Sequence, residues 1–210
     1  PEAVVIQLAG YPEEPSAFGD ADAIASILPM LSGWTSLNVP ADAADSLIDP
    51  VRHAAGAASV RLLDDIYHEL TDPVRDVRLP DVRLLTVDDR DLLRSAPMDL
   101  VGDNVDSLVE EMTWGHLAGA IRDGQLVSIA HTFARSERHV DIGVATLDVW
   151  RRQGLATAAA AQVAGAIQRD GRIPVWSCGG HNAASLAIAA RLGFREVARR
   201  TYLVPAFEAE

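Results

Sequence analysis

The chain has 210 residues, of which 49% are hydrophobic and 23% charged, and its formal net charge is −12. This composition is typical of one globular domain, or of one domain with a smaller companion, and not of a disordered chain. The negative charge argues against nucleic acid as a partner, and no apolar run is long enough to predict a membrane span.

The first third of the chain is predicted to alternate helices and strands. Asp20 is a suitable N-cap for the first helix, and Pro50 is expected to break the second. The predicted elements are helices over 20–31 and 41–55, strands over 34–40 and 59–70, and a turn-rich connection over 71–81.

From residue 82 onward, strands come first and then alternate with helices. Asp123-Gly124 lies between two apolar runs and is a strong signal for a β-hairpin. This order predicts an α/β protein whose mixed, mostly antiparallel sheet has helices on both faces. The predicted elements are strands over 82–87, 139–146, 173–178 and 194–204, a hairpin over 116–135, and helices starting at 88 and over 103–114, 154–169 and 182–192.

Charge is distributed unevenly between the two halves of the chain. Residues 1–113 hold 7 arginines and 22 acidic residues, whereas residues 114–210 hold 11 arginines and 8 acidic residues. An anionic ligand would therefore favour the second half and a cationic ligand the first. For most single acidic residues, a role in solubility is the alternative.

Cysteine and histidine usage indicate the compartment and the metal content. Cys178 is the only cysteine, so an internal disulfide is impossible, and the first residues lack a basic stretch ahead of the apolar ones. We therefore expect a cytoplasmic protein. The six histidines show no metal-binding spacing, so no metal is expected.

Strand 139–146 alternates between an apolar face and a face of small residues. The second face carries Asp141, Gly143 and Ala145. A glycine inside a strand often marks a bulge or the close approach of a ligand. The alternative is a strand packed beneath a helix, with Asp141 at a solvated edge.

The start of helix 154–169 is a candidate anion site. Its first backbone N–H groups have no partner within the helix, and Gly154 has no Cβ to block a ligand. Arg151 and Arg152 add positive charge, so the site suits a phosphate or pyrophosphate. The alternative is an exposed arginine pair, and the spacing of a nucleotide P-loop is absent.

Two motifs, in this order, resemble those of the GCN5-related N-acetyltransferases (GNAT). Arg151-Arg152-Gln153-Gly154-Leu155-Ala156 is similar to their Q/R-x-x-G-x-G/A signature. Asn182-x-x-Ser185, followed by Leu192-Gly193-Phe194, is similar to their next motif. The resemblance covers about residues 80–206 and looks closest to an uncharacterised subgroup. It implies the GNAT acyl-CoA N-acyltransferase fold over residues 81–210, with residues 1–80 as an extension or a degenerate half-copy of that fold.

The resemblance also implies acetyl-CoA as cosubstrate, bound where strand 139–146 parts from strand 173–178. Backbone groups of the first strand would hold the pantetheine arm, and the loop before helix 154–169 would hold the pyrophosphate. The implied cofactor-binding residues are Val144, Ala145, Thr146, Arg151, Arg152, Gln153, Gly154, Leu155, Ala156, Thr157, Asn182 and Ser185.

The implied reaction is direct transfer of the acetyl group to an amine, which requires a general base. Asp141 is the candidate base, because many family members carry a glutamate near this point, although it could equally be structural. His131 and His139 are rival bases. Glu110 and Glu111 would line the amine pocket or belong to a solvated face.

The group that protonates the leaving thiolate departs from the family pattern. Many members carry a tyrosine where this chain has Ala189, and Tyr202 is a candidate substitute. Cys178 would be an acyl carrier or, more simply, a small buried thiol.

Three functions remain open on the sequence. The favoured one is an acetyl-CoA-dependent N-acetyltransferase acting on a small amine or a peptide N-terminus, without a nucleic-acid or membrane partner and compatible with a homodimer. The second is a non-catalytic acyl-CoA-binding or regulatory module with the same fold. The third is a transferase that uses a longer acyl-CoA.

Overall fold

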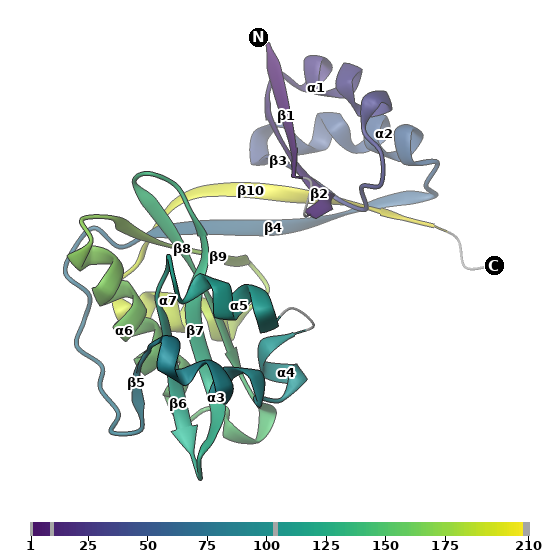
Figure 1. Ribbon diagram of the computed structural model, residues 1–210. Helices are drawn as coiled ribbons and strands as arrows, with labels where there is room; N and C mark the ends of the chain where they lie inside the picture. The colour runs from purple at the N-terminus through teal and green to yellow at the C-terminus, as the bar shows by residue number, and fades with distance from the viewer. Residues whose placement is uncertain (1, 9–10, 103–104, 208–210) are drawn as a thin grey trace. The chain divides into compact units, whose positions relative to one another are not determined.

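The computed structural model describes residues 2–8, 11–102 and 105–207 (Figure 1). Within these residues the fold is mixed α/β, as predicted, with ten mostly antiparallel strands and seven α-helices. The chain divides into two compact units, each described separately below. The first unit comprises Pro1–Tyr67, Cys178–Asn182 and Ala198–Glu210, and the second comprises His68–Ser177 and Ala183–Val197.

Each unit is a set of residues that contact one another and is discontinuous in the sequence. The predicted division into an extension or half-copy over 1–80 and a GNAT domain over 81–210 is a different kind of division and stays a prediction. Strands β4, β9 and β10 each contain residues of both units.

The first unit is built on strands in the order β1-β2-β3-β10-β4. Helices α1 and α2 pack on these strands through a core that includes Ile24, Leu47 and Leu203, all fully buried. The element bounds are β1 Ala3–Leu8, β2 Tyr11–Gly19, α1 Ala21–Ile27, β3 Leu37–Pro40, α2 Ala44–Ala55, β4 Ser59–Glu69 and β10 Arg195–Ala206.

The helix start predicted at Asp20 is confirmed, but the break predicted at Pro50 is wrong. The Asp20 side chain accepts hydrogen bonds from the N–H groups of the first turn of α1. Helix α2 continues through Pro50. Leu47 and Val51, on either side of the proline, are fully buried in the core. Their packing holds the helical path although Pro50 cannot donate a backbone hydrogen bond.

The hairpin of β1 and β2 is absent from the sequence prediction. Two prolines in β2, Pro12 and Pro15, argue against a strand. In the structure they lie between the pairs Ser16↔Ile6 and Tyr11↔Leu8, where the register shifts. The missing N–H groups therefore fall where the β1–β2 ladder is already interrupted.

The second unit contains strands in the order β9-β8-β7-β6-β5. The Asp123-Gly124 turn joins β6 to β7 with positive φ at both residues, which confirms the predicted hairpin. The bounds are β5 Val82–Leu85, α3 Arg90–Arg94, α4 Met98–Val101, α5 Val105–Glu111, β6 Leu117–Arg122, β7 Gln125–Arg135, β8 His139–Thr146, α6 Leu155–Arg169, β9 Ile173–Gly179 and α7 Ala183–Leu192.

Two differences from the prediction concern the helices before β6. Helix α4 is an addition, and the predicted start of helix 103–114 at residues 103–104 lies outside the described residues.

Helices cover the two faces of this second set of strands in different ways. Leu93, Leu100 and Leu108, from α3, α4 and α5, pack with Ile129 of β7 in one core. Helix α6 packs against β5, β6, β7 and β8 (Figure 1). It is buried nearly all round because small residues surround its apolar stripe. The stripe consists of Leu155, Ala159, Val163 and Ile167.

No helix in the described residues is both long enough and apolar enough to cross a membrane.

Candidate functional site

Strands β8 and β9 pair over a short stretch only. The parallel pairing runs from His139↔Ile173 to Asp141↔Val175. Strand β8 continues to pair with β7 as far as Thr146. Within the described residues, the edge of β8 that faces β9 is therefore unpaired beyond Asp141.

The direction of the backbone groups on this edge follows from the contacts with β7. The carbonyl of Ala145 accepts from Ser128 Oγ at 3.0 Å, and the N–H of Leu147 donates to a β7 carbonyl. Since adjacent residues of an antiparallel strand direct their backbone groups to opposite sides, Val144 directs its N–H and C=O away from β7. It presents one donor and one acceptor at the unpaired edge.

The turn from β8 into α6 requires two left-handed residues. Arg152 has φ 63° and Gly154 has φ 77°. A Cβ added to Gly154 would meet no atom within 4 Å. Glycine is therefore needed here for its backbone conformation, and the space beside it is open.

The N-terminus of α6 has no cap from a side chain and no acidic residue in its first turn. The first N–H with a partner on the helix is that of Ala158, which donates to the carbonyl of Gly154 at 3.0 Å. The preceding N–H groups, from Leu155 to Thr157, belong to the turn that has no intrahelical partners. This 15-residue helix thus directs several donors and the positive end of its dipole at the loop.

The two arginines of the loop differ in their surroundings. Arg151 forms an ion pair of 2.8 Å with Asp148, and its side chain is 66% exposed. Within the described part of the chain, no ion pair involves Arg152. An exposed pair such as Arg151–Asp148 contributes little to stability, so both guanidinium groups can serve an anion.

Asp141 lies where β8 and β9 separate. Its Oδ1 accepts from the N–H of Ile142 at 2.9 Å, and its Oδ2 accepts from Ser177 Oγ at 2.8 Å. Ser177 belongs to β9, two residues beyond the last paired position. The carboxylate therefore joins the two strands at their point of divergence, which gives Asp141 a structural role.

An acid–base pair lies on the same side of the sheet as α3, α4 and α5. Nδ1 of His131 on β7 lies 2.9 Å from Oε2 of Glu111, the last residue of α5. Glu111 is only 4% exposed, and burial raises the pKa of its carboxyl group. Its Oε1 is buried and has no hydrogen-bond partner among the described residues.

Gly143 makes room for this histidine. His131 and Gly143 are opposite each other in the β7–β8 ladder. A Cβ at Gly143 would lie 2.6 Å from Nε2 of His131, closer than such atoms approach. Gly143, for which the sequence left open a bulge, the approach of a ligand or packing beneath a helix, therefore accommodates an imidazole ring.

The remaining predicted residues are placed as follows. Ser185 Oγ accepts from the indole N–H of Trp176 at 2.9 Å, which joins α7 to β9. Asn182 directly precedes α7 but belongs to the first unit. His139 lies 3.3 Å from Glu69 at the start of β8, at the end of the strand away from the loop. Ala189 is fully buried.

His131 and Glu111 are both candidate residues in the sequence, but nothing in the sequence predicts that they pair. Twenty residues separate them, and no spacing rule links a helix end to the middle of a later strand. Among the described residues, no group of three or more His, Cys, Asp or Glu is arranged to hold a metal ion.

The strand order and the uncapped helix after a diverging strand define a mixed α/β protein, and solved GNAT proteins share this fold. Residues 115–203 match the family model described as GNAT acetyltransferase, and we assign them to that family. No curated protein matches the sequence.

Solved structures with this fold include three bacterial proteins. A GCN5-related N-acetyltransferase-like protein from Streptococcus suis is 22% identical, with a TM-score of 0.66 over 97% of this chain and 84% of that one. A GCN5-related N-acetyltransferase from Kribbella flavida is 18% identical, with a TM-score of 0.64 over 91% and 80%. An acetyltransferase of the GNAT family from Colwellia psychrerythraea is 12% identical, with a TM-score of 0.65 over 98% and 81%.

A double-mutant cycle tests the contact between Gly143 and His131. Gly143→Ala should cost about 1–3 kcal/mol in free energy of unfolding, because the new Cβ overpacks the ring. Adding His131→Ala removes the clash, so the double variant should lose at least about 0.5 kcal/mol less than the two single losses together. Urea unfolding measures each variant.

Gly119→Ala on β6 is the matched control, because its Cβ would contact Leu126 and Leu85 instead of His131. Its effect should add to that of His131→Ala. Additivity for Gly143→Ala as well would contradict the placement of the imidazole ring.

Proposed function

We propose that the chain is an acetyl-CoA-dependent N-acetyltransferase that transfers the acetyl group directly to a primary amine. One observation carries the proposal: the unpaired edge of β8 leads, through a loop with two arginines, into the uncapped N-terminus of α6. An extended amide-bearing chain can add to a strand edge through main-chain hydrogen bonds. A pyrophosphate fits the helix terminus that follows.

The residues present fit such a cosubstrate. The N–H and C=O of Val144 would pair with the pantetheine arm, flanked by Ala145 and Thr146. The N–H groups after Gly154, through Thr157, would donate to the pyrophosphate, with Arg151 and Arg152 beside it. When bound, acetyl-CoA supplies an activated thioester, and the chain's own task is to orient it and to accept a proton from the amine.

For the proton acceptor we favour His131 over Asp141. Both oxygens of Asp141 already accept hydrogen bonds within the sheet. His131 is held at Nδ1 by a buried glutamate, an arrangement that orients an imidazole so that Nε2 can accept a proton. In this assignment Glu111 and Asp141 are positioning residues. No general acid is assigned: Ala189 is buried and has no proton to donate, and the role of Tyr202 as its substitute stays a prediction.

The composition supports a proposed acceptor and a proposed compartment. The acidic first half of the chain favours a cationic amine or a peptide N-terminus as acceptor. A single cysteine, which cannot form an internal disulfide, is consistent with a cytoplasmic location.

Replacement of two glycines tests the cosubstrate site. Gly154 and Gly171 both have positive φ and open space around the missing Cβ, at opposite ends of α6. Alanine at either position should cost about 1–2 kcal/mol of stability, because both conformations are left-handed. Only Gly154→Ala should weaken acetyl-CoA, by at least about tenfold in Kd by calorimetry. Equal affinity in the two variants would contradict the placement of the pyrophosphate.

The base assignment predicts different effects for two substitutions. His131→Gln should lower kcat by at least about a hundredfold across a panel of primary amines, with acetyl-CoA affinity unchanged. Asp141→Asn should lower it less, because the amide can keep the hydrogen bond from Ser177. Release of free thiol from acetyl-CoA measures both.

A larger loss in Asp141→Asn than in His131→Gln would return the base role to Asp141. Acetyl-CoA binding without thiol release for any amine would instead favour the non-catalytic acyl-CoA-binding module. Comparing turnover of acetyl-CoA with that of a longer acyl-CoA decides the donor.

A further inference from the structure

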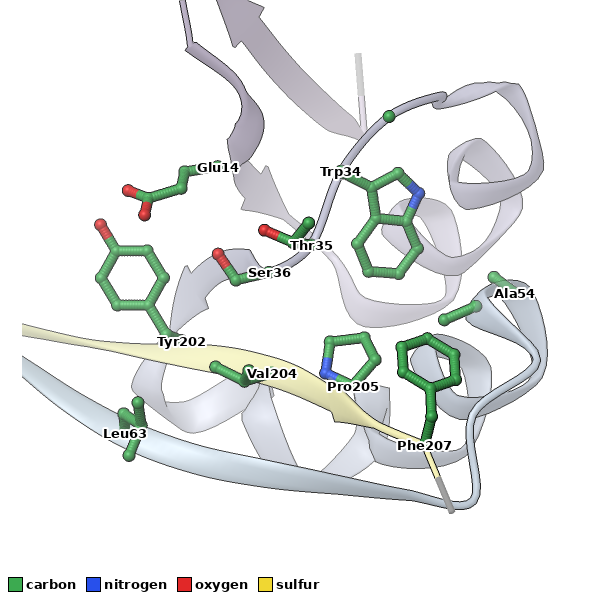
Figure 2. A pocket seen from close by; sticks show the side chains of 12 residues that line it. Glu14, Trp34, Thr35, Ser36, Ala54, Leu63, Tyr202, Val204, Pro205 and Phe207 are labelled. Atoms are coloured by element: carbon green, nitrogen blue, oxygen red, sulfur yellow. The ribbon is translucent and has the colours of Figure 1, made fainter. Parts of the chain in front are cut away.

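A cavity of about 780 Å³ lies entirely within the first unit (Figure 2). It is lined by the loop around residues 33–36, the end of α2, and residues of β4 and β10. Its size suits a small organic molecule. None of the residues to which the proposed acetyl transfer assigns a role lines it, although Tyr202, the sequence candidate for the missing acid, does.

One end of the cavity is polar. Figure 2 shows the Glu14 carboxylate near the hydroxyl group of Tyr202, with the hydroxyl groups of Thr35 and Ser36 on the same side. Burial, with the negative charges of Asp65 and Glu14, raises the pKa of Tyr202 to about 12. The phenol is therefore neutral at physiological pH, and its oxygen can accept a hydrogen bond.

The other end is apolar and aromatic. Trp34, Pro205 and Phe207 gather there (Figure 2). Trp34 is half-buried and packs against the core of the unit, whereas Phe207 is 67% exposed at the rim. Aromatic faces attract organic cations as well as apolar groups.

The frame of the cavity is held in place by the backbone. The N–H groups of Thr35 and Ser36 both donate to the carbonyl of Glu13, at 2.9 and 3.1 Å. Tyr202 is opposite Asn38 in the β3–β10 ladder, and Asn38 is almost completely buried. The backbone around Thr35, Ser36 and Tyr202 is therefore fixed before any ligand binds, which lowers the entropic cost of binding.

Charge selects the class of ligand. The first unit contains four arginines and twelve acidic residues, a formal charge of −8. None of the described residues that line the cavity is basic. Arg200, on the same strand as Tyr202, does not line the cavity: it donates to the carbonyls of Ala17 and Asn38 and stacks on Phe18, while its charge opposes the rise in the pKa of Tyr202.

We propose that this cavity binds a small organic cation, with its ammonium group between Glu14 and Tyr202 and its apolar body against Trp34 and Phe207. The proposal goes beyond acetyl transfer and does not depend on it, because binding alone is the readout.

Calorimetry with 2-phenylethylammonium and its neutral analogue 2-phenylethanol tests the proposal on the full chain. The ammonium compound should bind at least about tenfold more tightly than the alcohol. Glu14→Gln should remove most of that preference. Phe207→Ala, which changes an exposed side chain, should weaken both compounds.

Glu13→Gln is the matched control, since Glu13 is exposed on the same strand but its side chain does not line the cavity. It should leave both affinities unchanged. Equal affinity for the two compounds, equal effects of Glu13→Gln and Glu14→Gln, or no binding of the ammonium compound up to about 10 mM would each overturn the proposal.

Discussion

The candidate site depends on the point at which β8 stops pairing with β9. Parallel pairing ends at Asp141↔Val175, and the bond from Ser177 to Asp141 joins the strands there. Beyond this point β8 is held by β7 alone, so the backbone groups of Val144 are left at an unpaired edge. The left-handed turn at Gly154 then brings the helix terminus after that edge. The unpaired strand edge ends at Thr146 and the uncapped helix begins at Leu155, so two sets of backbone groups without partners lie close together in the sequence.

The same strand is constrained on the side of α3, α4 and α5. His131 occupies the space over Gly143, and Glu111 holds it from the end of α5. The buried carboxylate is costly to ionise, and the histidine is its hydrogen-bond partner. Gly143 therefore leaves room for the imidazole ring on the same strand that presents its unpaired edge to a ligand.

The sequence predicted the β6–β7 hairpin and helix α6 well, because their signals lie between residues that are close together in the chain. These signals are the Asp123-Gly124 turn, the start of α6 and the apolar stripe on α6. What they could not predict depends on tertiary packing. Pro50 stays helical because Leu47 and Val51 are buried around it. The Glu111–His131 pair requires knowing how α5 lies against β7. The role of Gly143 required the position of the ring opposite it.

The division of β4, β9 and β10 between the two units has a practical consequence. The chain passes from one unit to the other four times, so neither unit corresponds to a continuous fragment. A fragment that begins at the predicted domain boundary, residue 81, would keep β10 but lose β3, its partner in the first unit. Leu203, fully buried in that core, would then face solvent on an unpaired edge. A fragment cut in this way would therefore be prone to aggregate through the exposed edge of β10.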